Sequence, residues 1–293
     1  MRKCFYVLIL LLLIAKPSFS QQDQFASFAE NNINGYAQPF VTSLGVGLNS
    51  GGFYTAYVPR LFGFSISFRA MYILIPDNQK TFTPTLPAGY TANEPTATFW
   101  GSKIGTAYTG PNGYLPITGG INKSGVPFYM PQITGSLLGT EVLIRYLPQL
   151  KVGDKNLNYF GIGIRHSISQ YIPLIPLDLA VQVLYNKLSV TDLIDANSFA
   201  VNGEVSKTLG MFTAYGGIQY ESSKFDLTYT LNGDPSSPDP SLRQTRVINA
   251  SIKGKDNFRV ILGASVKLVV FVFNVDYNIC SQSVLTGGIS LDF

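Results

Sequence analysis

Residues 159–188 read YFGIGIRHSISQYIPLIPLDLAVQVLYNKL, and both halves of this stretch alternate between apolar and polar side chains. The apolar positions of the two halves are Phe160, Ile162, Ile164 and Ile168, then Leu179, Val181, Val183 and Tyr185. The opposite positions are Gly161, Gly163, Arg165 and Ser167, then Asp178, Gln182 and Asn186. Successive side chains of a strand point to opposite faces, so this period of two predicts a pair of two-faced strands.

The same alternation continues from Thr134 to the C-terminus. It predicts strands near 134–147, 157–170, 177–190, 195–207, 209–221, 223–232, 243–253, 256–267, 270–278 and 283–293. The segment 61–75 also alternates and is the eleventh. Bacterial single-chain barrels favour an even number, so a twelfth strand is expected at 46–58 or at 96–108. We favour 96–108, because it divides a long intervening segment into an outer and a periplasmic half.

The composition points to a lipid environment. Only 13% of the residues are charged, against about 25% in typical soluble domains. After residue 20 no apolar run has the length of a membrane-spanning helix, and only helices and closed barrels satisfy all backbone polar groups in lipid. A soluble β-sandwich would also alternate, but the apolar faces here end repeatedly in Tyr or Phe, as an interfacial aromatic girdle would. The fold class is therefore all-β: a transmembrane antiparallel β-barrel of about 12 strands (range 10–14).

The N-terminus predicts export. Arg2 and Lys3 precede an apolar run from Cys4 to Ala15, and small residues precede a cleavage point at Gln21, so residues 1–20 are a predicted signal peptide. Without them 18 basic and 17 acidic residues remain, a near balance that argues against a nucleic-acid partner. Cys280 is then the only cysteine, so an intramolecular disulfide is not expected.

Two segments have no clear strand pattern. In residues 21–58 the helical spacing of Phe25, Phe28, Ala29 and Ile33 predicts a short helix over 23–34, followed by a plug or a first strand. The barrel is expected to occupy residues 59–293. Within it, residues 76–133 hold 8 of the 17 prolines and 8 of the 28 glycines, which indicates a long loop or a second part of the plug.

The last strand carries a local signal of its own. One face of this strand holds Leu285, Ile289, Leu291 and Phe293, and the sequence ends at the aromatic residue. Such an end is typical of the signal by which outer-membrane barrels are recognised for insertion. The interpretation gives the chain two partners, outer-membrane lipid and the barrel-assembly machinery.

Several stretches resemble an uncharacterised family of outer-membrane barrel proteins from Bacteroidota. They are GLNSGGFYTA (47–56), MPQITGSLLGTEVLIRYLP (130–148), residues 159–188 and AYGGIQYESSKFDLTYT (214–230). The resemblance implies an N-terminal helical segment, a barrel and an outer-membrane location. It implies no reaction.

The candidate site is a polar cluster on the inward face, formed by Glu141, Arg145, Arg165, Asp178 and Gln182. These residues either line a solute path or form a salt-bridged network that fills the lumen, and the pattern leaves both open. His166 is the single histidine, and its strand phase places it on the lipid side, so no catalytic group, metal site or cofactor is predicted. The leading hypothesis is a bacterial outer-membrane barrel that passes or binds a small solute. The alternative is a closed structural or adaptor barrel.

Overall fold

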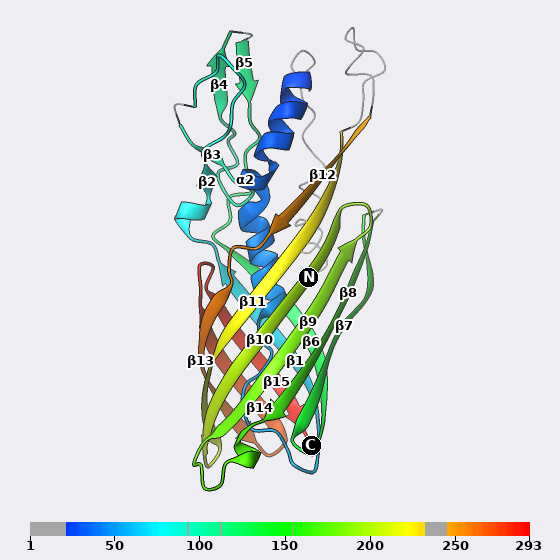
Figure 1. Ribbon diagram of the computed structural model, residues 1–293, viewed down its shortest axis with the longest axis vertical. Coiled ribbons are helices and arrows are strands. Elements are labelled where there is room, and N and C mark those ends of the chain that lie inside the picture. Colours follow the sequence, from blue (N-terminus) through cyan, green and yellow to red (C-terminus); the bar gives the residue numbers. More distant parts are fainter. Residues whose placement is uncertain (1–21, 93, 112, 154, 232–244) are drawn as a thin grey trace.

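The computed structural model describes residues 22–92, 94–111, 113–153, 155–231 and 245–293. The predicted signal peptide, residues 1–20, lies outside this part of the chain. Within the described residues, ten antiparallel strands close into a barrel (Figure 1). They are β1 (Phe62–Leu74), β6 (Gly125–Leu137), β7 (Thr140–Val152), β8 (Lys155–Ser167), β9 (Asp178–Val190), β10 (Ile194–Leu209), β11 (Phe212–Leu231), β13 (Phe258–Leu268), β14 (Phe271–Ile279) and β15 (Val284–Asp292).

The barrel closes between its first and last strands. β1 pairs with β15 from Ser65 opposite Asp292 to Ile73 opposite Val284, and β10 pairs with β11 along its whole length. Beyond β15, Phe293 exchanges two backbone hydrogen bonds with Phe64, of 2.9 and 3.1 Å. The terminal residue therefore belongs to the closing ladder.

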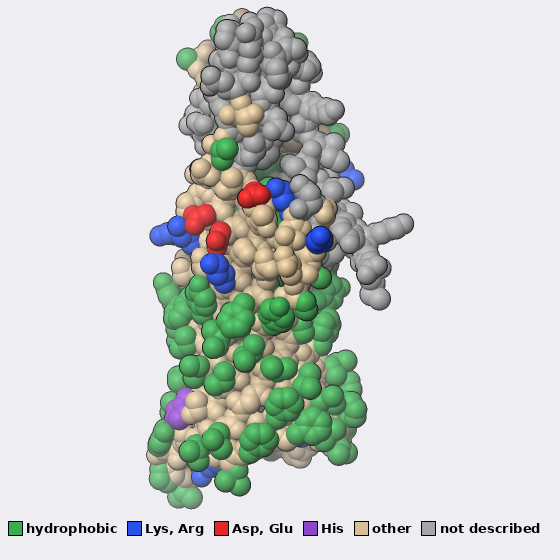
Figure 2. Space-filling view, turned by 90° about the vertical axis from the view of Figure 1, so that its right-hand side faces the viewer, with side chains coloured by type: hydrophobic (Ala, Val, Ile, Leu, Met, Phe, Trp, Pro, Cys, Tyr) green, Lys and Arg blue, Asp and Glu red, His purple; other side chains and the backbone are tan. Residues whose placement is uncertain are grey.

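The outer face of the barrel is apolar from end to end. Alternation in each strand turns the apolar residues outward, and β14 shows it most simply with Phe271, Phe273, Val275, Tyr277 and Ile279 all exposed. Figure 2 shows this band, with the charged side chains of that face gathered mainly above it. Each of nine strands contributes an exposed or half-exposed aromatic residue toward the end away from the C-terminus: Tyr72, Tyr129, Tyr146, Phe160, Tyr185, Phe199, Tyr220, Phe258 and Tyr277.

The inside of the barrel is occupied by the chain itself. Helix α2 (Gln22–Asn49) enters the barrel from above in the view of Figure 1, and residues 50–59 continue to the end where β1 begins. We call residues 46–59, the last turn of α2 and the extended chain after it, the plug segment. Among the described residues, no helix is long and apolar enough to cross a membrane.

The part above the barrel contains the upper half of α2, residues 75–124 and an extension of the wall. The connection holds η1 (Asp77–Gln79), β2 (Thr81–Phe82), β3 (Thr96–Ala97), β4 (Ala107–Gly110) and β5 (Gly113–Pro116). β12 (Arg246–Lys253) pairs only with the upper part of β11 and lies outside the closed barrel. A short 3-10 helix, η2 (Ser169–Tyr171), lies in the β8–β9 loop at the opposite end.

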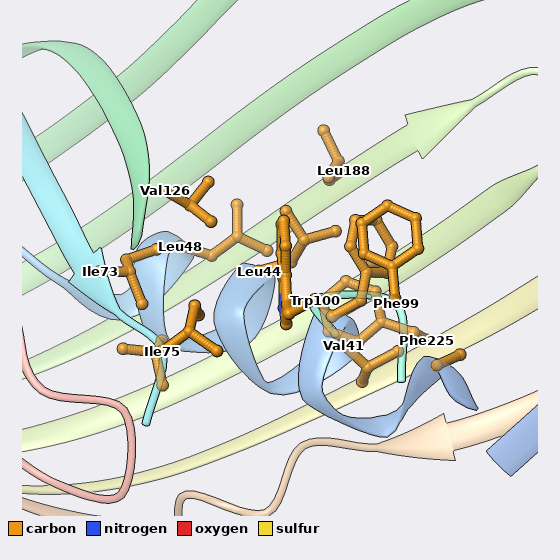
Figure 3. Packing of buried hydrophobic residues seen from close by; sticks show 14 of the residues in the cluster. Val41, Leu44, Leu48, Ile73, Ile75, Phe99, Trp100, Val126, Leu188 and Phe225 are labelled. Atoms are coloured by element: carbon orange, nitrogen blue, oxygen red, sulfur yellow. The ribbon is translucent and has the colours of Figure 1, made fainter. Parts of the chain in front are cut away.

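An apolar cluster closes the upper mouth of the barrel. Val41, Leu44 and Leu48 of α2 pack against Phe99 and Trp100 of the connection and against inward residues of the strand ends (Figure 3). The indole Nε1 of Trp100 donates a 3.0 Å hydrogen bond to Ser43 Oγ, so its polar atom is satisfied although the ring is buried.

The structure confirms the all-β barrel, with ten strands at the lower limit of the predicted range. Neither proposed twelfth strand is present: residues 46–58 are plug, and 96–108 hold only β3 and the start of β4. The predicted strands 209–221 and 223–232 are one strand, β11, and 243–253 corresponds to β12 outside the barrel. Segment 76–133 is shorter than expected, because β6 begins at Gly125.

The predicted strand 134–147 is a hairpin. Leu138 and Gly139 both have positive φ, 52° and 72°, which is the geometry of a two-residue type I′ turn. Leucine rarely adopts this conformation, so the alternation appeared to run through the turn. The helix is also longer than the predicted 23–34. Gly45 lies where a Cβ would approach Ser223 Oγ to 2.3 Å, so this glycine lets α2 fit against β11 inside the barrel and does not end the helix.

Candidate functional site

The end of α2 lies inside the barrel, where its last carbonyl groups need hydrogen-bond donors. Arg145 of β7 supplies two: Nη1 donates to Leu48 O and Nη2 to Ser50 O, both at 2.8 Å. Arg259 of β13 donates from Nη2 to Val46 O at 3.2 Å. Cations at a helix C-terminus are favoured by the helix dipole, and here they also satisfy carbonyls that water cannot reach. Both arginines are fully buried.

The charge of Arg259 is compensated by the wall. Its Nη2 lies 2.6 and 2.5 Å from the two carboxylate oxygens of Glu221 on β11, and its Nη1 contacts Ser50 Oγ at 2.5 Å. Gln219 donates a further 2.7 Å hydrogen bond to Glu221. Buried ion pairs need such additional hydrogen bonds to offset desolvation. Arg259 thus joins β11, β13 and the end of α2.

A second charged group holds the lower part of the plug segment. Arg165 Nη2 lies 2.9 Å from Glu141 Oε2, and its Nη1 lies 3.5 Å from Glu204 Oε2 on β10. The same Nη1 donates a 2.5 Å hydrogen bond to Thr55 O. Next to it, Ser206 Oγ accepts from the amide of Ala56 at 3.0 Å and lies 3.2 Å from Thr55 Oγ1.

Amides and one aromatic pair complete the contacts. Gln182 Nε2 donates to Gly52 O at 3.3 Å, and Asn186 Nδ2 donates to Asn49 Oδ1 at 3.1 Å. On the opposite wall the guanidinium of Arg69 lies 4.6 Å from the ring centroid of Tyr54, close enough for a cation–π interaction. Tyr54 in turn donates to both carboxylate oxygens of Asp292, at 2.8 and 2.7 Å.

The five residues of the sequence-derived cluster therefore occupy different places. Glu141 and Arg165 form one ion pair, and Arg145, Arg165 and Gln182 bind the plug backbone. Asp178, the first residue of β9, is half-buried at the lower end and lies 3.5 Å from Ser206 Oγ. Leu285, Ile289, Leu291 and Phe293 all lie on the outer face, exposed or half-exposed.

Sequence reasoning missed Arg69, Glu204, Glu221 and Arg259. The alternation of the segments 61–75, 195–207, 209–221 and 256–267 carried a signal for all four, because each falls on the polar face of its strand. The acceptors in the plug segment are mostly backbone carbonyls, which no residue type identifies. This explains why the helix end and the plug contacts were not predicted.

The site offers ion pairing and hydrogen bonding between the barrel wall and the plug segment. No group of three or more His, Cys, Asp or Glu side chains among the described residues is placed to hold a metal ion. His166 faces outward near the lower end, where Nδ1 lies 2.8 Å from Thr140 Oγ1 and Nε2 lies 2.9 Å from the Tyr171 hydroxyl. Ser167 points inward, away from it.

The closed strand order, the apolar outer face and the filled lumen define an antiparallel β-barrel protein. The chain belongs to a family of unknown function (DUF6588), whose model matches residues 1–293. No match was found among curated protein sequences.

Similar solved structures are outer-membrane barrels. CdiB from Acinetobacter baumannii is 9% identical with a TM-score of 0.21, and the match covers 80% of this chain and 60% of CdiB. The outer membrane channel DcaP of Acinetobacter baumannii is 11% identical with a TM-score of 0.21, covering 79% and 96%. The Ralstonia pickettii toluene transporter TbuX is 8% identical with a TM-score of 0.19, covering 81% and 90%. At these values nothing of their activity transfers to this chain.

Proposed function

We propose that this protein is an integral barrel of the bacterial outer membrane whose axial lumen is closed by its own plug segment. The observation that carries the proposal is the set of three buried arginines, Arg145, Arg165 and Arg259, that hydrogen-bond carbonyl oxygens of the plug from three different strands. In this state the barrel does not conduct along its axis. It serves as a closed envelope barrel that holds α2 and residues 75–124 at one membrane surface.

The apolar outer band supports the membrane location. A transmembrane strand needs about 9–11 residues, and β14 and β15, with 9 residues each, are apolar outward along that whole length. Three connections at the lower end are two-residue turns, at 138–139, 210–211 and 269–270, whereas the longest described connection, residues 75–124, is at the upper end. Since long connections of such barrels lie outside, the lower end is the expected periplasmic end. This orientation places residues 75–124 and the extension of β11 and β12 outside the cell.

The strength of the plug contacts supports a lasting closure. A hydrogen bond to a charged group contributes about 1.5–3 kcal/mol. Removing the partner of a buried ion is strongly destabilising, because an uncompensated charge then remains buried. Withdrawing residues 46–59 would break these bonds together. It would also remove Val46 and Leu48 from the apolar cluster at the mouth.

A second candidate, a channel that opens when the plug leaves, is favoured by one observation. The wall around the plug is polar, with Gln182, Asn186, Asn202, Ser206 and Glu204 all buried against it. Without the plug these groups would face water. The barrel would then have the polar interior of a pore.

Planar-bilayer conductance distinguishes the two candidates. Thr55→Cys/Ser206→Cys in a Cys280→Ser background places a disulfide where the two hydroxyl oxygens lie 3.2 Å apart, and so locks the plug to β10. The closed barrel predicts no stable conductance in either the oxidised or the reduced protein. Conductance that appears on reduction and disappears on oxidation would establish the channel instead, and wild-type protein gives the unlocked reference.

A further inference from the structure

The barrel wall has one incomplete seam. β6 and β7 are paired only from Leu137 opposite Thr140 to Gln132 opposite Arg145. Above that rung the two strands continue, as residues 125–131 and 146–152, without a ladder between them. We call this unpaired stretch the β6–β7 seam. The opposite edges of the two strands are paired. β6 pairs with β1 through Gly125, and β7 pairs with β8 up to Val152 with one register shift.

Prolines explain where the ladder stops. The type I′ turn at Leu138–Gly139 makes residues 137 and 140 a hydrogen-bonded pair, and every second pair above it should bond likewise. Continuing the observed register puts Pro131 opposite Tyr146 and Tyr129 opposite Pro148, up to the register shift of β7 between Leu147 and Leu150. Both of these bonding positions contain one proline, and Pro127 is the next residue of β6 with the same phase; a proline has no N–H to donate. The prolines therefore remove one of the two hydrogen bonds that each such pair would exchange, and the regular ladder stops there.

The backbone groups of an open seam in lipid need polar partners. Backbone groups without partners inside the hydrocarbon region each cost several kcal/mol. The seam lies at the level of the exposed Tyr129 and Tyr146, which belong to the aromatic residues near the upper edge of the apolar band. Its unpaired amides and carbonyls therefore lie close to the lipid headgroups.

Behind the seam lies the apolar cluster that closes the mouth of the barrel. Val126 and Met130 of β6 point inward and are buried in it. Phe128 and Leu147 also pack against the cluster, but both remain half-exposed, so the seam gives access to its edge. Directly below the seam the interior is polar. At the last paired rung, Arg145 Nε donates a 3.0 Å hydrogen bond to Gln132 Oε1.

We propose that the β6–β7 seam is a lateral portal that binds a single-chain anionic amphiphile from the bilayer, with its acyl chain against Phe128 and Leu147. A polypeptide strand is a poor occupant, because prolines on both borders block strand addition. An acyl chain matches the apolar cluster, and a carboxylate-type headgroup matches Lys151 at the end of β7 and Lys123 before β6, both exposed. The proposal rests on the membrane location in the proposed function but not on the closed axial lumen.

Trp100 provides a built-in reporter, because it is the single tryptophan of the chain and lies in the apolar cluster. In lipid nanodiscs we expect dibrominated stearate to quench Trp100 fluorescence saturably. Pro127→Val/Pro131→Val/Pro148→Val restores the three missing N–H donors. The ladder between β6 and β7 should then extend into the seam. The apparent affinity should then fall about tenfold or more, the loss expected when only about two methylene groups leave an apolar site.

Pro173→Val, in the β8–β9 loop at the opposite end, is the matched control and should bind like wild type. Equal quenching of the wild type and the triple variant, or no saturable quenching of the wild type, would overturn the portal. Heat-modifiable migration of each variant reports barrel assembly, so loss of the membrane barrel itself would be recognised separately.

A second measurement uses the wild-type protein alone and does not depend on folding of the triple variant. A stearate analogue with a photoreactive diazirine at the chain end should label Phe128, Met130 or Leu147, located by mass spectrometry. Labelling restricted to outward residues such as Tyr129, Ile133 and Ile144 would mean ordinary annular lipid. That result would also overturn the proposal.

Discussion

Arg145 Nη1 donates a 2.8 Å hydrogen bond to Leu48 O, which links the barrel wall to the last turn of the helix inside it. Its Nη2 makes the second such bond, to Ser50 O. Arg145→Met keeps much of the side-chain volume but removes both bonds and also the 3.0 Å bond from Nε to Gln132 Oε1. We expect the free energy of unfolding to fall by about 3 kcal/mol or more, because two bonds to a charged donor already contribute this much at the low end of their range. Urea unfolding in detergent micelles measures this change.

Lys224→Met is the matched control for that experiment. Lys224 pairs with Asp226 at 3.2 Å, but their side chains are 53% and 49% exposed. Exposed pairs of this kind contribute about 0–1 kcal/mol. A loss as large for Lys224→Met as for Arg145→Met would contradict the special role of the buried arginine.

Glu221→Ala should be among the most destabilising single changes in the wall. It leaves the fully buried Arg259 without its carboxylate, and breaking a buried pair in this way costs about 3–5 kcal/mol. The double variant Glu221→Leu/Arg259→Met should recover much of the loss, because it removes both charges. If the double variant is the less stable of the two in urea unfolding, the assigned pairing is wrong.

Gly45→Ala tests the close fit of α2 inside the barrel. A Cβ at this position would lie 2.3 Å from Ser223 Oγ and 2.8 Å from Ser223 Cβ, so we expect a loss of about 1–3 kcal/mol from overpacking. In the wall, Gly203→Ala would meet only Ile218 Cγ1 at 3.6 Å, which is ordinary contact. In thermal unfolding, Gly203→Ala should therefore have a clearly higher midpoint temperature than Gly45→Ala.

Tyr36 makes stability depend on pH in the alkaline range. Burial raises the pKa of the Tyr36 hydroxyl from 10.0 to about 12, and this hydroxyl donates a 3.1 Å hydrogen bond to Gly119 O. Because the folded pKa is the higher one, its contribution is complete below pH 10 and is lost as the pH rises from 10 to 12. Tyr36→Phe should be less stable than wild type at pH 8 and should lose less stability between pH 10 and 12. Parallel curves for the two proteins would contradict this role.

Phe293 lets the two roles of the C-terminus be separated. Deleting it removes both backbone hydrogen bonds to Phe64, whereas Phe293→Ala keeps them and removes only the exposed ring. If the ring is the insertion signal, both variants should accumulate poorly in outer-membrane fractions. Normal assembly of Phe293→Ala would contradict a role of the ring as insertion signal. Phe293 would then act only through its two backbone hydrogen bonds to Phe64.

The fold could be predicted where a strand has one exposed apolar face. Residues 157–170 and 177–190 alternate because one face is exposed and apolar and the other faces the barrel interior, so β8 and β9 were located to within a few residues. Prediction failed at Leu138, where an uncommon turn residue hid a hairpin. It also failed for the helix, predicted over 23–34, because α2 continues to Asn49 through glycines such as Gly45, which serves close packing against β11. The candidate site was only partly predictable, because Arg145 and Arg165 bind backbone carbonyls brought to them by the tertiary fold.

The central claim, that residues 46–59 lie inside the assembled barrel, is tested most directly by cross-linking in the membrane. Thr55→Cys/Ser206→Cys, in a Cys280→Ser background and without added oxidant other than air, should form an intramolecular disulfide in isolated outer membranes. Mass spectrometry of the digested protein would detect it in most molecules. If both thiols instead remain free and react with a water-soluble maleimide, the plug segment does not lie against β10 and the account is wrong.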